Sequence, residues 1–270
     1  MLKRIHIIFF ILVLAGTFSS CSKYNKMIKN ADISKKYEIA IDLYNKGDYV
    51  RALPLFEELM TVYKGTDKAE TVYYYYAYTN YNLGDYVLGG YYFHAFAKTY
   101  PNSPHTEECE YMYAYCYYLN SPTYSLDQSD TKTAIQAFQE FANQFPNSDK
   151  LTKCNQLIDN LRAKLQRKAY ENAKLYYYIE DYKAAIVAFK NVLKDYPDIK
   201  QKEEINFLIV KSNYLLAINS IDLKKPERLQ NTVSAYLKYV DMFPQGAFLK
   251  DAEQIYNSAL KEQQKIKKQS

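Results

Sequence analysis

The chain has 270 residues, of which 48% are hydrophobic and 24% charged, with a formal net charge of +5. This balance is typical of a globular protein, and the charge is too small to indicate a nucleic-acid partner. The sequence contains 31 Tyr but no Trp, and it has only 7 Gly and 8 Pro. So few turn-forming residues argue against an all-β sandwich or barrel and against a nucleotide-binding α/β fold with Gly-rich loops, and they favour a helical repeat protein.

The first residues have the three zones of a bacterial secretory signal. Lys3 and Arg4 supply a basic start, residues 5–15 are apolar, and small residues lead to Cys21. The apolar run is shorter than the roughly 20 residues that a transmembrane helix needs. We therefore predict that residues 1–20 are a signal peptide that is removed.

A lipid anchor is expected at the end of this signal. Residues 18–21, Phe-Ser-Ser-Cys, resemble the lipobox of bacterial lipoproteins, with Phe in place of the usual Leu. The resemblance implies that Cys21 becomes the first mature residue and is acylated, palmitate included, which attaches the protein to a membrane. No other cofactor is expected. The alternative is that Cys21 is an ordinary residue near a plain signal-peptidase site.

The residues after Cys21 bear on where the protein is kept. Residues 21–33 are polar and basic and are predicted to be a lipidated tether, and residues 22–26 contain no acid. They resemble neither the Asp signal that retains enteric lipoproteins at the inner membrane nor the acidic surface-export tag of Bacteroidetes lipoproteins. By that resemblance, we expect the periplasmic face of the outer membrane in a Gram-negative, Bacteroidetes-like cell.

An internal repeat is the strongest feature of the mature sequence. Four times an aromatic residue is followed eight positions later by Pro, and Phe56 begins the same pattern with Lys64 in the Pro position. The aromatic residues of the five repeats are Phe56, Phe93, Phe138, Phe189 and Tyr236. A small residue stands four positions before each of them: Ala52, Gly89, Ala134, Ala185 and Thr232. The predicted helix before each of these helices also carries an alanine at similar spacing: Ala40, Ala77, Ala114, Ala173 and Ala217. Small residues in both helices of a unit allow close antiparallel packing, and Pro ends the second helix.

The spacing of the repeats is uneven, and the sequence predicts where the extra residues go. Residues 121–128 form a loop before the third repeat. Residues 149–178 hold no Gly or Pro and form one long helix before the fourth. Residues 218–227 lead to the fifth repeat, and residues 247–266 form a capping helix.

These helix–turn–helix units resemble the tetratricopeptide repeat (TPR). The expected fold is all-α, a right-handed superhelical solenoid of about five TPR-like repeats that ends in the capping helix. Residues 34–148 are assigned to repeats 1–3 with a substrate groove. Residues 149–270 are assigned to repeats 4–5, the cap and the tail, with partner docking.

The mature sequence carries no constellation typical of an enzyme. It has no Gly-rich phosphate loop, no Gly-x-Ser-x-Gly motif and no His-Glu-x-x-His motif. His105 and Cys109 lie four residues apart, but no third or fourth ligand lies nearby in the sequence, so no metal site is expected. His94 is predicted to be a core or interface residue.

Three cysteines remain in the mature chain after Cys21. Cys109 and Cys116 lie about 10 Å apart along one predicted helix, too far to form a disulfide. We predict that these two and Cys154 are buried free thiols, with a Cys116–Cys154 disulfide as the alternative. Adjacent acids such as those at positions 107–108 point in different directions and are predicted to lie on solvated faces.

Tyrosines line one face of each predicted first helix. They recur at i, i+4 and i+7, the spacing of one stripe, and in a TPR solenoid this face lines the concave surface, as the resemblance implies. The stripe consists of Tyr37, Ile41 and Tyr44, then Tyr74, Tyr78 and Tyr81, then Tyr111, Tyr115 and Tyr118. Asn45 and Asn82 follow where TPR peptide receptors place polar contacts. We predict an aromatic groove without Lys or Arg that binds extended peptide; the alternative is that these tyrosines belong to the core.

Signal, lipobox, repeats and length together resemble the BamD family of outer-membrane protein assembly lipoproteins, across residues 34–260. The most specific segments are Tyr-Pro-Asn-Ser at 100–103, residues 126–131 with 134–148, and residues 192–198. The loop before the third repeat lacks the Arg-Asp element common in proteobacterial members. The resemblance implies a non-catalytic scaffold that docks on the POTRA domains of the barrel insertase BamA, with unfolded barrel proteins and other assembly lipoproteins as further partners.

The resemblance also suggests where the insertase binds. Docking is expected in the carboxyl-terminal half, around Lys194, Asp195, Tyr196 and Pro197. Two other functions remain as alternatives at this point. One is a different periplasmic TPR adaptor lipoprotein of an envelope or cell-division complex, and the other is a glycan-binding lipoprotein of the nutrient-uptake type.

Overall fold

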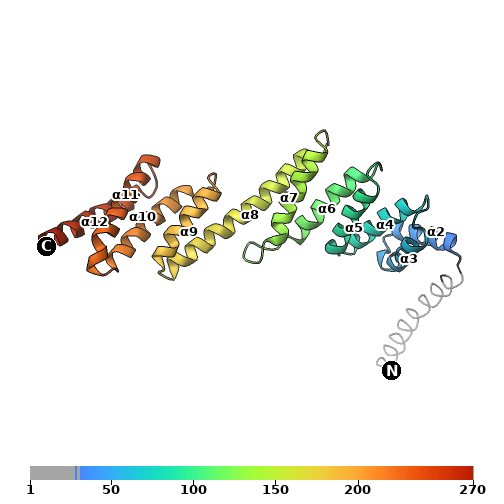
Figure 1. Ribbon diagram of the computed structural model, residues 1–270, viewed down its shortest axis with the longest axis horizontal. Helices are drawn as coiled ribbons and strands as arrows, with labels where there is room; N and C mark the ends of the chain where they lie inside the picture. The colour runs from blue at the N-terminus through green and yellow to red at the C-terminus, as the bar shows by residue number, and fades with distance from the viewer. Residues whose placement is uncertain (1–27, 29–30, 270) are drawn as a thin grey trace, which may run out of the picture. The chain divides into compact units, whose positions relative to one another are not determined.

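The computed structural model describes residue 28 and residues 31–269, and this part of the chain folds into helices without a β-strand (Figure 1). Cys21, the signal peptide and most of the tether lie outside the described residues. The α-helices are α2 (Ile33–Asn45), α3 (Tyr49–Val62), α4 (Ala69–Asn82), α5 (Tyr86–Thr99), α6 (Thr106–Asn120), α7 (Ser129–Gln144), α8 (Leu151–Tyr178), α9 (Tyr182–Asp195), α10 (Lys202–Ile218), α11 (Lys225–Met242) and α12 (Leu249–Gln269).

The helices follow one another as the repeat pattern predicts. The pairs α2–α3, α4–α5, α6–α7, α8–α9 and α10–α11 correspond to the five sequence repeats, and α12 is the capping helix. Helix α8 is the long uninterrupted helix expected over 149–178, and a short 3-10 helix, η1 (Asp222–Lys224), precedes α11. The predicted all-α fold of TPR-like helix pairs with a carboxyl-terminal cap is confirmed.

Small residues lie where the helices touch. All five repeat alanines of the first helices and all five small residues of the second helices are buried. Gly89 shows why size matters, because a Cβ atom added to it would lie 3.1 Å from the backbone nitrogen of Tyr81 in α4. A Cβ on Gly90 would lie 3.1 Å from the Cβ of Cys116 in α6. These contacts let α5 approach both of its neighbours closely.

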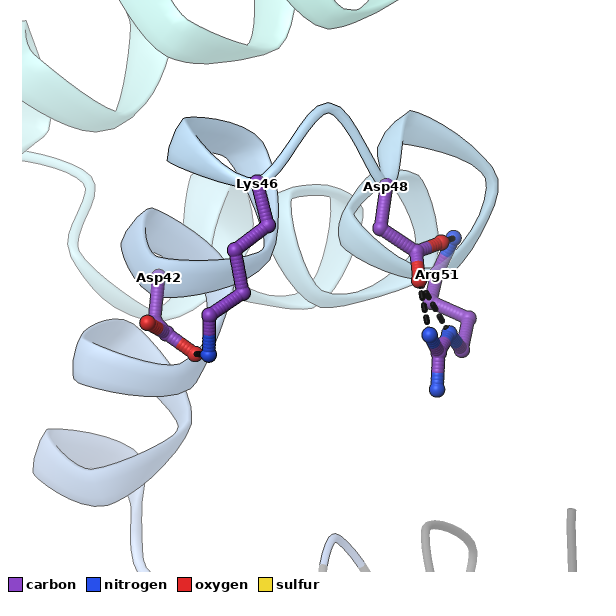
Figure 2. A network of polar contacts seen from close by, with 4 residues as sticks. All are labelled: Asp42, Lys46, Asp48 and Arg51. Carbon is purple, nitrogen blue, oxygen red and sulfur yellow. Dashed lines mark hydrogen bonds and ion pairs between the residues drawn. The ribbon is translucent and has the colours of Figure 1, made fainter. Parts of the chain in front are cut away.

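In the first two repeats, a Gly-Asp pair builds the turn between the two helices. Gly47 has φ +75°, which favours glycine, and Asp48 accepts a hydrogen bond from the backbone N–H of Arg51 at 3.3 Å, which caps α3. The Arg51 guanidinium also pairs with Asp48, while Lys46 pairs with Asp42 at 2.6 Å on α2 (Figure 2). Asp85 and Asp181 cap α5 and α9 in the same way.

The chain divides into two compact units. The first comprises the described residues up to Pro122 together with Ser129–Ile158, and the second comprises Thr123–Gln128 with the chain from Asp159 onward. In the first unit, Phe56 and Phe93 are buried between helices of the first two repeats. The functional division between 34–148 and 149–270 is not tested by packing and stays a prediction.

In the second unit, residues 123–128 of the loop between α6 and α7, which the sequence placed before the third repeat and which lies inside it, pack on α8. The ammonium of Lys168 donates to the carbonyl oxygen of Leu126 at 2.5 Å, and the Arg167 guanidinium lies 4.1 Å from the Tyr124 ring centroid. The buried Gln128 side chain donates to the carbonyl oxygen of Thr123 at 2.8 Å. The loop is therefore fixed by polar contacts rather than by regular structure.

The fifth repeat departs from the others in its aromatic residue. Tyr236 is only half-buried, and its ring stacks on Tyr256 of α12 at 4.4 Å between centroids. Tyr239 is fully buried instead, and its hydroxyl donates to Glu203 of α10 at 2.9 Å.

Candidate functional site

Eight tyrosines and Ile41, on α2, α4 and α6, form the candidate site, and we call these nine stripe positions the tyrosine face. Every member is half-buried. The Tyr74 and Tyr78 rings lie 4.8 Å apart, and the Tyr78 ring packs edge-on against the buried Phe93 at 4.7 Å. The rings thus cover the core on one side and reach solvent on the other. Whether they bind peptide stays a prediction.

A carboxylate lies at the centre of the tyrosine face. Tyr74 and Tyr78 of α4 donate their hydroxyls to the two oxygens of Glu108 in α6, at 3.0 and 2.5 Å. Burial, followed by the hydrogen bond to Glu108, raises the pKa of Tyr78. Glu108, which was expected on a solvated face, keeps 40% of its side chain exposed, but two phenols from the neighbouring repeat also donate to it.

The other acid of this pair is also engaged. Glu107 accepts a hydrogen bond from the hydroxyl of Ser148 at 2.6 Å. It is half-buried in the first turn of α6, whereas Ser148 lies in the turn after α7. Adjacent acids on a helix do point in different directions, as expected, but here each direction holds a partner.

A lysine lies on the tyrosine face of the first repeats. The ammonium of Lys68 is 4.6 Å from the Tyr37 ring centroid and 5.2 Å from that of Tyr63. Such cation–π contacts stabilise a charge between two rings. The expectation of a stripe without Lys or Arg is therefore wrong at this end, where one face of the Tyr37 ring is covered.

Tyr44 and Asn82 contact each other across the first two repeats. The Asn82 amide donates to the Tyr44 hydroxyl at 3.4 Å, and the Tyr44 ring packs edge-on against Tyr75 at 4.8 Å. Burial raises the pKa of Tyr44 to about 12. Asn45 is exposed, as a polar contact residue requires.

The third repeat presents a stack of parallel rings. Tyr111 and Tyr115 lie 5.9 Å apart, and Tyr115 and Tyr118 lie 5.7 Å apart, with interplanar angles of 12° and 13°. Tyr81 completes the set on α4 and packs on Tyr86 at 5.6 Å. The aromatic surface thus extends over three helices, with its hydroxyls paired mainly around Glu108.

His94 and the three described cysteines lie as the sequence predicted. His94 forms an interface between repeats, since its Nδ1 lies 3.1 Å from Glu110 and its ring stacks on Tyr113 at 4.3 Å. The three described cysteines are buried free thiols, so the alternative of a disulfide between two of them is wrong. Among the described residues, no group of three His, Cys, Asp or Glu side chains is arranged to hold a metal ion.

The proposed docking residues lie at the end of α9. Lys194 and Asp195 are exposed in its last turn, and Pro197 is exposed beyond it. Tyr196 is half-buried against the core that α8, α9 and α10 share, and burial raises its pKa. Its backbone accepts from the N–H of Ile199 at 3.1 Å, which closes the turn.

Lys194 also lines a cavity that the sequence did not predict. It has a volume of about 780 Å³ and lies between α9, α10 and α11. Lys183, Lys190 and Lys194 line it from α9, and Lys238 lines it from α11. The spacing of the three α9 lysines at i, i+7 and i+11 is a signal of one helix face, but it does not reveal the facing helix.

In the part of the chain that the structure describes, no helix is both long and apolar enough to cross a membrane.

A search of curated proteins found no match. Solved structures that resemble the chain contain TPR domains, at low identity. One is the TPR2AB domain of yeast Sti1 in its pHSP90 complex, with 14% identity and a TM-score of 0.40 over 84% of this chain and 98% of that chain. Another is the P58(IPK) TPR domain, with 14% identity and a TM-score of 0.42 over 91% of this chain and 68% of that chain. A third is the thermophilic TPR protein TTC0263 of Thermus thermophilus, with 16% identity and a TM-score of 0.33 over 85% of this chain and 99% of that chain.

The family assignment rests on a family model instead. Residues 29–229 match the model of YfiO, described as an outer membrane lipoprotein. The match begins before α2, continues through the tyrosine face and the docking residues, and ends in the first turns of α11. Because it covers well over half of the sequence, the chain belongs to the YfiO (BamD) family of outer membrane lipoproteins with TPR repeats.

Proposed function

We propose that this protein is a non-catalytic periplasmic scaffold of the machinery that assembles β-barrels in the outer membrane. It is anchored by lipid on Cys21, docks on the POTRA domains of a BamA-type insertase, and receives unfolded barrel proteins. The observation that carries this proposal is the family match over residues 29–229, which spans described helices of both compact units.

Docking is assigned to the carboxyl-terminal repeats. Lys194 and Asp195 are exposed, while the half-buried Tyr196 and the bond from Ile199 hold the turn in a fixed shape. A rigid turn loses little conformational entropy on binding, which favours a specific contact. A positive Lys194 at a helix end suits an acidic group on the insertase.

Substrate binding is assigned to the tyrosine face. An extended strand advances about 3.3 Å per residue, so a segment of about eight residues spans the first helices of three repeats. Because Glu108 already accepts the hydroxyls of Tyr74 and Tyr78, the rings rather than these hydroxyls are the contact groups. Aromatic ends of barrel strands would stack on them, and binding should be weak and tolerant of salt.

The anchor is tested by Cys21→Ala in the full precursor. The variant should appear as a soluble periplasmic protein without acyl label, whereas the wild type remains in the outer-membrane fraction. Metabolic labelling with a fatty-acid analogue reports the lipid directly. Acylation that persists in the variant would show that the anchor lies elsewhere.

Docking is tested by affinity purification of the tagged lipoprotein from membranes. The wild type should recover an Omp85-type barrel protein, and Lys194→Glu should reduce that recovery. Lys224→Glu is the matched control, because Lys224 is also exposed but lies in η1, away from the end of α9. Equal recovery by both variants would remove Lys194 from the interface.

The tyrosine face is tested with photo-crosslinking peptides from barrel carboxyl termini. Tyr115→Ala with Tyr118→Ala removes a stacked pair, and Tyr74→Phe with Tyr78→Phe keeps the rings but removes both hydroxyls from Glu108. We expect the first variant to lose crosslinks and the second to keep them. Tyr176→Ala with Tyr178→Ala, at exposed tyrosines of α8, is the control. Wild-type crosslinking by the Tyr115/Tyr118 variant at unchanged helical content would assign the face to the core.

A further inference from the structure

The charged side chains that line the cavity between α9, α10 and α11 are all positive. Its lining includes four lysines, Lys183, Lys190, Lys194 and Lys238, and neither Asp nor Glu. All four lysines are exposed. We call this cavity the lysine groove. Clefts lined by charges of one sign concentrate the field and attract groups of the opposite sign.

No carboxylate within the described residues neutralises the lysine groove. Some other lysines of the same unit are paired, such as Lys174 with Glu204 at 3.7 Å and Lys225 with Asp222 at 3.0 Å. The four groove lysines form no ion pair of this kind with any acid that the structure describes. Their charges therefore remain available to a ligand from outside the chain.

The inner surface of the lysine groove is apolar. Ile186 of α9 and Ile209 of α10 are buried at its base, while Leu193 and Leu216 are half-buried. Val187 lies between Lys183 and Lys190 on the same helix face and is 55% exposed. The lysine groove therefore presents apolar side chains beside unpaired positive charges, so it can take apolar and acidic groups together.

Two asparagines add a fixed polar element. Asn206 and Asn213 lie seven residues apart on α10, line the groove and are more than nine-tenths buried. Their amide groups donate to the carbonyl oxygens of Lys202 and Ile209, each at 2.8 Å. These bonds fix the orientation of both amides in the lining of the groove.

We infer that the lysine groove binds an acidic amphipathic segment of a protein partner. The inference rests on the proposed scaffold function and specifies the chemistry that its carboxyl-terminal repeats recognise. Lys183 and Lys194 are eleven residues apart, about 16 Å along α9. A partner helix of about three turns has this length, with acidic side chains toward the lysines and an apolar ridge toward Val187 and the isoleucines.

The shape of the groove favours such a segment over an anionic membrane. A bilayer presents a broad surface, which meets exposed lysines but does not reach a base between three helices. A peptide helix brings both carboxylates and apolar side chains into a hollow of this kind. Apolar contact at Val187 is therefore the feature that separates the two ligands.

The test places the photo-crosslinking residue p-benzoylphenylalanine at Val187 in the full lipidated chain, in cells. A second position, Leu237, is the control, since it is 56% exposed on α11 but does not line the groove. Irradiation should give an adduct at position 187 only. Mass spectrometry of that adduct should identify a segment with net negative charge and apolar residues at helical spacing.

Charge reversal supplies the second arm. Lys190→Glu with Lys238→Glu should reduce the adduct about tenfold or more, because like charges then face the acidic segment. Lys224→Glu with Lys250→Glu, two exposed lysines outside the groove lining, should leave it unchanged. An adduct with lipid, an adduct with a basic or neutral segment, or an adduct unaffected by reversal would overturn the inference.

The insertase measured in the same purifications separates the two proposals. If the reversed groove recovers the insertase and keeps its adduct, the groove inference fails and the scaffold function stands. If the wild type recovers no insertase, the scaffold function fails whatever the adduct shows. A charge-dependent adduct with an acidic segment of another protein would then still support the groove.

Discussion

The hydroxyl of Ser103 donates a hydrogen bond of 2.5 Å to the carboxylate of Glu70 and thereby closes the second repeat. Glu70 lies in the first turn of α4, and Ser103 lies in the Pro-Asn-Ser turn after α5. The Ser103 oxygen also accepts from the backbone N–H of His105 at 3.1 Å. The third repeat repeats the arrangement, with Ser148 in place of Ser103 and Glu107 in place of Glu70. The Pro-Asn-Ser turn is thus a hydrogen-bonding device as well as a helix end.

Removing this bond should destabilise the first unit. Ser103→Ala leaves the Glu70 carboxylate and the His105 N–H without their partner, and we expect the free energy of unfolding to fall by about 1 kcal/mol. Guanidinium unfolding followed by circular dichroism measures the change. Asn102→Ala, at an exposed neighbour, is the control. A double-mutant cycle with Glu70→Gln should show coupling of about 0.5 kcal/mol or more, and additive effects would contradict the bond.

The turn of the fourth repeat carries a removable strain. Glu180 has φ +64°, where Gly47 and Gly84 stand in the equivalent turns. A non-glycine residue in this region costs about 1–2 kcal/mol, so Glu180→Gly should stabilise the second unit by about 1 kcal/mol after the loss of chain entropy. The midpoint of unfolding in guanidinium reports it. Glu180→Ala is the control and should give no such gain, since alanine keeps the same steric clash.

The repeat frame could be predicted because its causes are local. Small residues such as Ala77 and Gly89 recur at fixed spacing, and Pro follows the second helix in four of the five repeats. Each of these is a requirement of backbone geometry, so it is visible in one sequence. The same holds for α8, whose length follows from the absence of Gly and Pro between its ends.

The polar chemistry of the site could not be predicted in this way. Glu108 receives hydroxyls from Tyr74 and Tyr78, which lie 34 and 30 residues earlier in the chain. Sequence spacing gives the face of a helix but not which acid the next helix brings to it. The lysine groove was missed for the same reason, because Lys238 joins the α9 lysines only through the packing of α11.

Burial should make the thiols inert in the native protein. Desolvation raises the pKa of Cys116 to about 12 and that of Cys154 to about 11, and it raises the pKa of Cys109 as well. Since the thiolate is the nucleophile, we expect iodoacetamide at pH 8 to leave all three unlabelled. Mass spectrometry of a soluble chain that begins after Cys21 measures this. The same protein in guanidinium should label at all three positions, and rapid native labelling of Cys109 would contradict its burial.

Alkaline pH should unfold the protein through its tyrosines. Burial raises the pKa of Tyr44, Tyr73, Tyr111, Tyr113 and Tyr170 to about 12, whereas the unfolded chain loses these protons near pH 10. Between about pH 10 and 12 the folded state therefore holds more protons than the unfolded state. The free energy of unfolding must then fall as the pH rises through this window. Below about pH 10 these tyrosines are protonated in both states, so they add no pH dependence there.

Absorbance at 295 nm and circular dichroism, recorded together, test this prediction. The first tyrosine ionisations should occur near pH 10, the ordinary value for a phenol in water, while the helices are intact. The buried rings should ionise only as helicity is lost, in one steep step at higher pH. In guanidinium the whole titration should move to about pH 10, which is the control for the unfolded state. If every tyrosine of the native protein titrates near pH 10 without loss of helix, the rings of the tyrosine face are not desolvated, and the hydroxyls that Tyr74 and Tyr78 donate to Glu108 are not protected from solvent.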